Sequence, residues 1–295
     1  MTDPLASGQP EPAQSDSPQP DRIQSGEASA PDRDPVLSFR NVSIAFDGPP
    51  VLDDITFSVA PGETRILLGP AGVGKSVLLK RCNGLLRPDR GSIRLFGEEI
   101  ATMPEEKMFP LRVRTGMVFQ ESALFDSLTV RDNVAYQLIQ ERVPDDEIDS
   151  RVRPALSFVG LEETVSMYPS SLSGGMRRRV AIARALIRHP ELLLYDSPTG
   201  GLDPVTSTTI IELIMKERDV HQTPSLLVTH RLQDAFTMAT HQFDKATNQM
   251  IVLPKGQRGE VPMSFLILRD GKVIFDGDAQ QLAASRDDYI REYIS

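Results

Sequence analysis

The chain has one cysteine, no tryptophan and no long apolar run, and each shortage excludes a class of protein. With Cys82 alone, no internal disulfide can form, which suits a reducing compartment such as the cytosol. No window holds the roughly 18 consecutive apolar residues that a membrane-spanning helix needs. The first residues are acidic and polar, whereas a secretory signal has a basic start and an apolar core. We therefore expect a cytoplasmic globular protein.

Basic residues are also in short supply. The 295 residues include 32 Lys and Arg against 41 Asp and Glu, which gives a net charge of −9. Nucleic-acid-binding domains usually carry a basic patch, so we expect no nucleic-acid partner. Residues 1–34 hold seven acids and two bases and are rich in Pro and Ser. Such a segment buries too little apolar surface to offset chain entropy, so we predict a disordered tail, either simply solvating or used for docking.

From Val36 onward, short apolar strands alternate with helical patterns, ending in a helical stretch at residues 279–293. Alternating strands and helices indicate an α/β fold with a mainly parallel sheet. The strands that matter most for function are expected at Thr64–Leu68, Met117–Phe119, Leu192–Tyr195 and Ser225–Val228, and the helices at Lys75–Leu85, Gly174–Arg188 and Ser207–Glu217.

A glycine-rich segment, residues 69–76, lies between a predicted strand and a predicted helix. It matches G-x-x-x-x-G-K-[ST], in which glycines let backbone N–H groups turn toward phosphate oxygens and the helix start adds positive partial charge. We expect Lys75 to reach the β- and γ-phosphates of a nucleotide and the Ser76 hydroxyl to bind Mg²⁺. The predicted phosphate loop consists of Gly69, Pro70, Ala71, Gly72, Val73, Gly74, Lys75 and Ser76.

Further along, the apolar run Glu191–Asp196 ends in a carboxylate. A buried strand can hold Asp196 beside the phosphate loop, where it would orient Mg²⁺ through its water shell. Any buried strand can end in Asp, so the run alone is weak evidence. It gains weight as the second of two required parts, found in the required order.

The segment Leu172–Met176, here called the signature segment, reads LSGGM and precedes an Arg- and Ala-rich helix. Ser173 can cap this helix, and Gly174 and Gly175 expose its first amides, which creates a second anion site. This segment, with the helix that follows it, resembles the signature motif of ABC ATPases. The resemblance of the chain to that family covers about residues 36–240 and resumes near Phe265.

The resemblance implies a P-loop NTPase (RecA-like) core with a mainly parallel sheet, an antiparallel β subdomain and an inserted α-helical subdomain. In this chain the ATPase domain would span 35–295, with the helical subdomain at about 121–178 and the C-terminal helix at about 279–293. An insertion at about 242–263 departs from the family; it would be an exposed hairpin or loop, or else a contact with a permease or membrane.

The resemblance also implies a dimer, here a homodimer, in which each ATP–Mg²⁺ lies between one subunit's phosphate loop and the other's Ser173, Gly174 and Gly175. Asp203 belongs to the loop that would cross this interface.

Other residues match single positions of the family. Gln120 corresponds to the residue that senses Mg²⁺ and the attacking water, and His230 to the residue that contacts the γ-phosphate. Phe46 stands where an aromatic ring would stack on adenine, although a lone aromatic residue is more often part of the core.

One position departs from the family pattern. Most members carry Glu directly after the strand-ending Asp, but this chain has Ser197. A neutral hydroxyl cannot act as a general base near pH 7, and losing such a base typically costs about 10²–10⁴-fold in rate. We hypothesise normal ATP binding with slowed hydrolysis. The alternative is that Asp203, His230 or Gln120 positions the water well enough.

The segments Ala-Leu-Phe at 123–125 and Asn-Val-Ala-Tyr at 133–136, together with Met176, narrow the resemblance. They look like those of the ATPases of Mla-type phospholipid transporters, which work with MCE proteins. The implied partners are a membrane permease and an MCE-type lipid-binding protein, and the implied place is the inner face of the cell membrane. The rival functions are an ATP-gated clamp with little hydrolysis and a non-transport ABC ATPase.

Overall fold

Six strands form the central sheet of the computed structural model, which describes residues 34–254 and 256–294. Neighbouring strands are parallel except at one edge, where β12 runs antiparallel to β11. In spatial order the strands are β12 (Lys272–Gly277), β11 (Met263–Arg269), β3 (Thr64–Leu68), β8 (Ser225–Val228), β7 (Leu192–Asp196) and β6 (Thr115–Val118).

The inner strands of this sheet carry mostly apolar residues on both faces because both faces are covered. The core consists of two hydrophobic clusters, one on each face of the sheet. Along β7, Leu192 and Leu194 point into the first cluster, whereas Leu193 and Tyr195 point into the second. This alternation is the period-two pattern of a strand, and it fixes which side chains follow the last residue of each strand.

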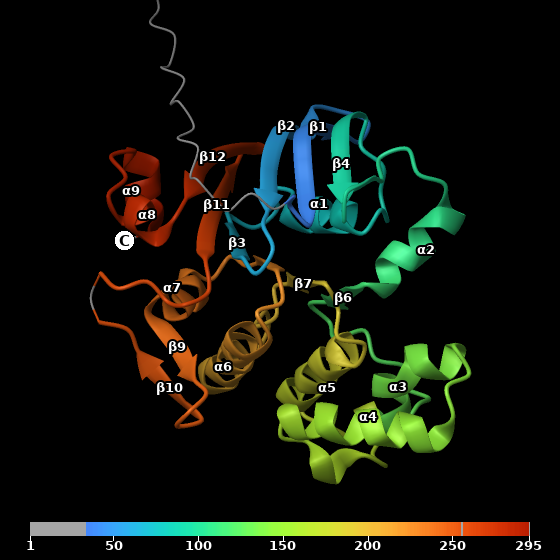
Figure 1. Ribbon diagram of the computed structural model, residues 1–295. Coiled ribbons are helices and arrows are strands. Elements are labelled where there is room, and N and C mark those ends of the chain that lie inside the picture. The colour runs from blue at the N-terminus through green and yellow to red at the C-terminus, as the bar shows by residue number, and fades with distance from the viewer. Residues whose placement is uncertain (1–33, 255, 295) are drawn as a thin grey trace, which may run out of the picture.

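An antiparallel sheet and helix α1 (Lys75–Cys82) share the first cluster. Figure 1 shows this sheet at the top of the molecule, beside α1. The sheet has the order β2 (Pro50–Val59), β1 (Leu37–Ala45), β4 (Arg90–Leu95) and β5 (Glu98–Glu99), and α2 (Glu105–Val113) follows it in the chain.

The second cluster is covered by helices, of which α3, α4 and α5 gather at the lower right in Figure 1. These three helices, α3, α4 and α5, all lie between β6 and β7 in the chain. The helices are α3 (Val130–Gln140), α4 (Asp145–Phe158), α5 (Gly174–Leu186), α6 (Pro204–His221) and α7 (Leu232–Thr240), with short 3-10 turns at Glu162–Thr164 and Pro169–Ser171. The predicted fold class, a mainly parallel core with antiparallel and helical subdomains, is confirmed.

The end of the chain departs from prediction. Instead of one helix at 279–293 there are two, α8 (Ala279–Ala283) and α9 (Asp288–Ile294). The break arises from local side-chain bonds, since Ser285 Oγ accepts from Asp287 N–H at 3.3 Å and Asp287 accepts from Ile290 N–H at 3.0 Å. Such bonds compete with helix continuation and start a new helix.

The segment 242–263 contains most of a two-stranded antiparallel hairpin, β9 (His241–Asp244) and β10 (Gln249–Val252). The predicted acidic tail, residues 1–34, lies outside the described residues except for Asp34. No helix within residues 34–254 or 256–294 combines the length and the apolar character that a bilayer crossing needs.

Candidate nucleotide-binding site

The phosphate loop leaves the carboxyl end of β3 and leads into α1. Gly72 and Gly74 have φ values of 80° and 100°, a left-handed region that favours glycine. Gly69 is crowded as well, because a Cβ there would lie 2.6 Å from the Leu268 carbonyl oxygen. No side chain caps α1. Its first amides therefore remain available to an anion, as the sequence predicts.

Lys75 is a buried cation inside this loop, only 7% exposed. Its Nζ donates to the carbonyl oxygens of Gly69 and Pro70, both at 2.7 Å. Burial lowers the pKa of Lys75, and the nearby charge of Asp196 opposes that shift. Because both of its hydrogen-bond acceptors are neutral, the ammonium group is suited to gain an anionic partner, such as a phosphate oxygen.

Ser76 and Asp196 meet at the start of α1. The Ser76 hydroxyl donates to Asp196 Oδ1 at 3.1 Å, although the two residues are 120 positions apart. Asp196 is 8% exposed, and burial raises its pKa against the hydrogen bond from Ser76 and the charge of Lys80. One hydroxyl and one carboxylate form the sparse oxygen set that Mg²⁺ takes together with waters and substrate phosphates. These residues fit Mg²⁺, which would neutralise charge on the β- and γ-phosphates.

Ser197 begins the tight turn that follows β7, here called the post-β7 turn (residues 197–200). It is buried with φ of 44°, its N–H donates to Val228 O at 2.8 Å, and its carbonyl accepts from Gly200 N–H at 2.8 Å. Gln120, predicted to sense Mg²⁺, lies against this turn, because a Cβ on Gly200 would be 3.4 Å from Gln120 Cγ. The fold thus brings Gln120, Asp196 and Ser197 together.

His230 follows β8 and is exposed. Its neighbour Arg231 donates its N–H to Thr229 Oγ1 at 3.0 Å. The loop is tied to the post-β7 turn, because the buried Thr199 hydroxyl donates to the Asp234 carboxylate at the start of α7. The predicted γ-phosphate contact of His230 remains a prediction.

Phe46 lies in the turn between β1 and β2 and is 53% exposed. The alternative that Phe46 is a core residue is therefore wrong. An exposed ring is available for stacking on a base, and that role stays a prediction.

The signature segment starts α5 as predicted. Ser173 is exposed, and its hydroxyl caps the helix by accepting from Met176 N–H at 3.2 Å. Gly175 is packed against α6, since a Cβ there would lie 2.4 Å from Thr206 Cγ2. Asp203 caps α6 by accepting from Thr206 N–H at 3.0 Å, which lowers the pKa of its carboxyl. A carboxylate stabilised in this way is a weak base.

No hydrogen bond within the described part of the chain joins residues 173–175 to the phosphate loop. The two predicted anion sites are therefore separate features of one subunit.

Sequence reasoning missed Arg178, which lies on α5 and is 4% exposed. Its Nη1 donates to Phe119 O at 3.0 Å and Ser197 O at 3.5 Å, and its Nη2 donates to Gly200 O at 3.4 Å. The available signal was helical spacing, because Gly175, Arg178 and Ile182 fall on one buried stripe. Tyr293 was missed as well. Its hydroxyl accepts from Gly69 N–H at 3.1 Å, so α9 touches the phosphate loop.

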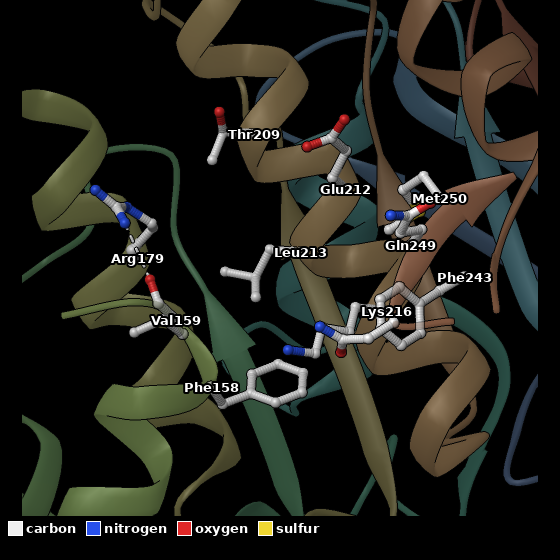
Figure 2. A pocket seen from close by; sticks show the side chains of 11 residues that line it. Phe158, Val159, Arg179, Thr209, Glu212, Leu213, Lys216, Phe243, Gln249 and Met250 are labelled. Carbon is white, nitrogen blue, oxygen red and sulfur yellow. Dashed lines mark hydrogen bonds between the residues drawn. The ribbon is translucent and has the colours of Figure 1, made fainter. Parts of the chain in front are cut away.

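A surface groove of about 540 Å³ lies elsewhere, between the end of α4, α6 and the β9–β10 hairpin (Figure 2). There, Lys216 Nζ lies 4.7 Å from the ring centre of Phe158 and 5.6 Å from that of Phe243. None of the predicted nucleotide-site residues lines this groove.

Comparisons with known proteins agree with this geometry. The ABC transporter family model matches residues 52–200. A methionine import ATP-binding protein, MetN 2 of Bacillus cereus, is 36% identical over 88% of this chain and 73% of its own length. The intermembrane phospholipid transport system ATP-binding protein MlaF of Escherichia coli (strain K12) is 32% identical over 88% of both chains.

Two solved structures are also similar. The ATP-binding cassette MJ0796, in a dimeric post-hydrolysis state bound to ADP and Pi, aligns with a TM-score of 0.68 and 26% identity over 82% of this chain and 98% of its own. CbiO1 of Clostridium perfringens, part of the ABC transporter complex CbiONQ, aligns with a TM-score of 0.72 and 27% identity over 88% and 94%. The chain therefore belongs to the ABC transporter family of ATP-binding proteins, as an ATPase whose cofactors are ATP and Mg²⁺.

Proposed function

We propose that this chain is the ATP-binding subunit of an ABC transporter for phospholipids. In this proposal two copies close head to tail around ATP–Mg²⁺ and drive a membrane permease. The observation that carries it is the meeting of the Ser76 hydroxyl and the buried Asp196 carboxylate at 3.1 Å beside the phosphate loop. This pair provides the metal side of a nucleotide site.

The dimer is supported by what the signature segment lacks. Ser173 is exposed at the start of α5, and within the described part of the chain no anionic side chain bonds to the first helical amides beyond its cap. A second copy could supply the phosphates of its own bound ATP to this helix start. The dimeric state of the similar cassette MJ0796 agrees with this arrangement.

A mixing experiment tests the dimer. Chains with Lys75→Ala have a defective phosphate loop and an intact signature segment. Chains with Ser173→Arg have an intact phosphate loop and a defective signature segment. If the sites are shared, an equimolar mixture of two nearly inactive variants regains one working composite site in each mixed dimer, which with random pairing gives about a quarter of the wild-type rate. Chains carrying both substitutions serve as the control. A mixture as inactive as its components contradicts shared sites.

A phospholipid substrate is supported by the match to MlaF, which extends over equal shares of both chains, whereas the MetN relative has a quarter of its length outside the match. The Mla-like segments also have a structural basis. The buried Asn133 amide donates to Phe125 O, Leu128 O and Thr129 O at 3.0–3.1 Å, which orders the loop before α3.

That loop presents a surface for a permease. Phe125 is 42% exposed and stacks on Tyr136 with ring centres 4.4 Å apart. The decisive experiment is to purify the chain from its native membrane and identify the permease that accompanies it. The permease complex is then tested for ATP-dependent movement of labelled phospholipid, with labelled methionine as the competing substrate. Transport of methionine instead would contradict the lipid proposal.

Ser197 favours a second candidate, an ATP-gated clamp that hydrolyses slowly. Asp203 is occupied in capping α6, which leaves Gln120 and His230 to orient water at the site. Slow single-turnover hydrolysis with tight ATP binding would favour the clamp, and fast steady-state turnover would reject it.

A further inference from the structure

Arg178 is a feature of the site that the family motifs leave unexplained. It is a guanidinium group 4% exposed to solvent, on the buried stripe of α5. A buried cation is costly unless it is hydrogen-bonded, and here the partners are carbonyl oxygens rather than a carboxylate. Its Nε has no partner at all within the described structure. Because burying this side chain is unfavourable, we expect a functional reason in the segments that it contacts.

The three carbonyls that Arg178 binds belong to two separate segments. Phe119 O directly precedes Gln120, and Ser197 O and Gly200 O open and close the post-β7 turn. These segments lie 59 and 19–22 residues from Arg178 in sequence. The planar guanidinium of Arg178 thus bridges two backbone segments. One carries Gln120, the predicted water-sensing residue, and the other carries Ser197, which stands where the family has its catalytic Glu.

The charge of Arg178 also acts on the metal side of the site. Burial lowers the pKa of Arg178, and the charges of Glu121 and Asp196 oppose that shift. Arg178 is bonded to the backbone just before Gln120 and to Ser197, and Ser197 directly follows Asp196 on the metal side of the site.

We propose that Arg178 is a positioning residue that holds Gln120 and Ser197 in register with Asp196 and links them to the signature segment. It lies five residues after Ser173 on the same rigid helix, about 7 Å along the axis. Movement of the helix start, when it engages the other subunit's nucleotide, would shift the Arg178 fork and the two segments it holds. This inference rests on the proposed shared site.

The helix supplies its own control in Arg179. This neighbour has the same charge and also donates to two carbonyls, Val159 O at 3.0 Å and Gly160 O at 3.2 Å. Figure 2 shows Arg179 beside Val159, at the groove formed by α4 and α6. Arg179 therefore matches Arg178 in chemistry and bonds to a different part of the protein.

The test compares Arg178→Gln, Arg178→Lys and Arg179→Gln in steady-state ATP hydrolysis. A misplaced water and turn affect the chemical step, so we expect Arg178→Gln to lower kcat about tenfold while KM for ATP changes less than about twofold. Lysine keeps the charge but cannot span both segments, so Arg178→Lys falls between. Arg179→Gln stays within about twofold of wild type in both constants.

Amide hydrogen exchange gives a readout that needs no turnover. Gly200 N–H bonds to Ser197 O and Ser122 N–H bonds to Phe119 O, the same carbonyls that Arg178 holds. In Arg178→Gln both amides exchange faster, while those of β7 are unchanged. The inference is overturned if exchange at these amides matches the Arg179→Gln variant, or if kcat and Tm fall while KM for ATP rises, as in general loosening. Wild-type protein without hydrolysis would instead contradict the proposed function, and exchange would still decide the role of Arg178.

Discussion

The phosphate loop and the signature segment both lie at the start of a helix, but the side chains around them differ. Each places glycines at the start of a helix and offers free amides to an anion. The phosphate loop has buried groups of both signs around it, Lys75 and Asp196, whereas the signature segment contains no charged side chain and exposes Ser173, which caps its helix. The difference teaches that one helix start has its charged groups within its own subunit, whereas in the proposed dimer the other is completed by the partner.

The largest expected effect concerns the Glu that most family members carry after Asp196 and that this chain replaces with Ser197. Ser197→Glu restores a carboxylate after Asp196, and the backbone, held by the bond from Ser197 N–H to Val228 O, can stay in place. We expect turnover to rise by about 10²–10⁴-fold with ATP affinity nearly unchanged. Ser197→Gln has the same size without the base and serves as the control in the same steady-state assay. Equal rates for Glu and Gln would show that Ser197 does not limit hydrolysis.

The next effect tests the buried cation. Lys75→Ala removes the ammonium group from the phosphate loop, and we expect affinity for a fluorescent ATP analogue to fall about 100-fold, as expected for losing charge-assisted hydrogen bonds. Lys80→Ala, an exposed lysine on the same helix, keeps affinity within about twofold. Comparable losses in both variants would mean that general positive charge, rather than the loop, holds the phosphates.

A smaller effect probes the exposed helix start. Gly175→Ala places a methyl group 2.4 Å from Thr206 Cγ2, so α5 and α6 must move apart. We expect ATP turnover to fall about tenfold while nucleotide binding to the phosphate loop is kept. Thr206→Ser removes the opposing methyl and should be near neutral alone. Turnover in the double variant then recovers, and a double variant as slow as Gly175→Ala would show that steric contact is not the cause.

The smallest effect is on stability and has opposite signs in the two regions. Burial raises the pKa of Asp196, so its ionisation destabilises the fold above that pKa, and the penalty fades as pH falls toward the ordinary Asp range. Asp196→Asn therefore raises Tm of the nucleotide-free protein at pH 7.5, by a margin that shrinks in acid. The capping bond lowers the pKa of Asp203, whose ionised form stabilises the fold at neutral pH and loses that effect in acid.

The matched variant Asp203→Asn should accordingly keep or lower Tm at pH 7.5. Thermal unfolding followed by circular dichroism at pH 7.5 and 5 measures both variants. A rise in Tm for both would contradict the difference between the buried and the exposed carboxylate.

The sequence predicts those parts of the site whose chemistry and spacing are local. The phosphate loop needs its glycines, Lys75 and Ser76 within eight consecutive residues, and Ser173 caps the helix that it directly precedes. The sheet could be predicted because strands buried on both faces, such as β7 up to its final Asp196, consist of consecutive apolar residues.

What the sequence could not provide are contacts between distant segments. Arg178 is one of three consecutive arginines; helical spacing can place it on the buried face, but only the fold determines that it reaches Phe119, Ser197 and Gly200. The break between α8 and α9 was missed for a different reason. Ser285 and Asp287 can lie on an exposed helix face as readily as at its end, so composition alone does not choose between them.

The hydrogen bond between Tyr293 and Gly69 connects α9 to the phosphate loop, although the two residues are 224 positions apart. A protein or a fused tag that binds the final turn of α9 can therefore displace the loop without entering the nucleotide site. The carboxyl end of the chain is thus an unsuitable place to immobilise the protein for kinetic work. It is a good place to attach a reporter dye, whose signal would follow loading of the loop from outside.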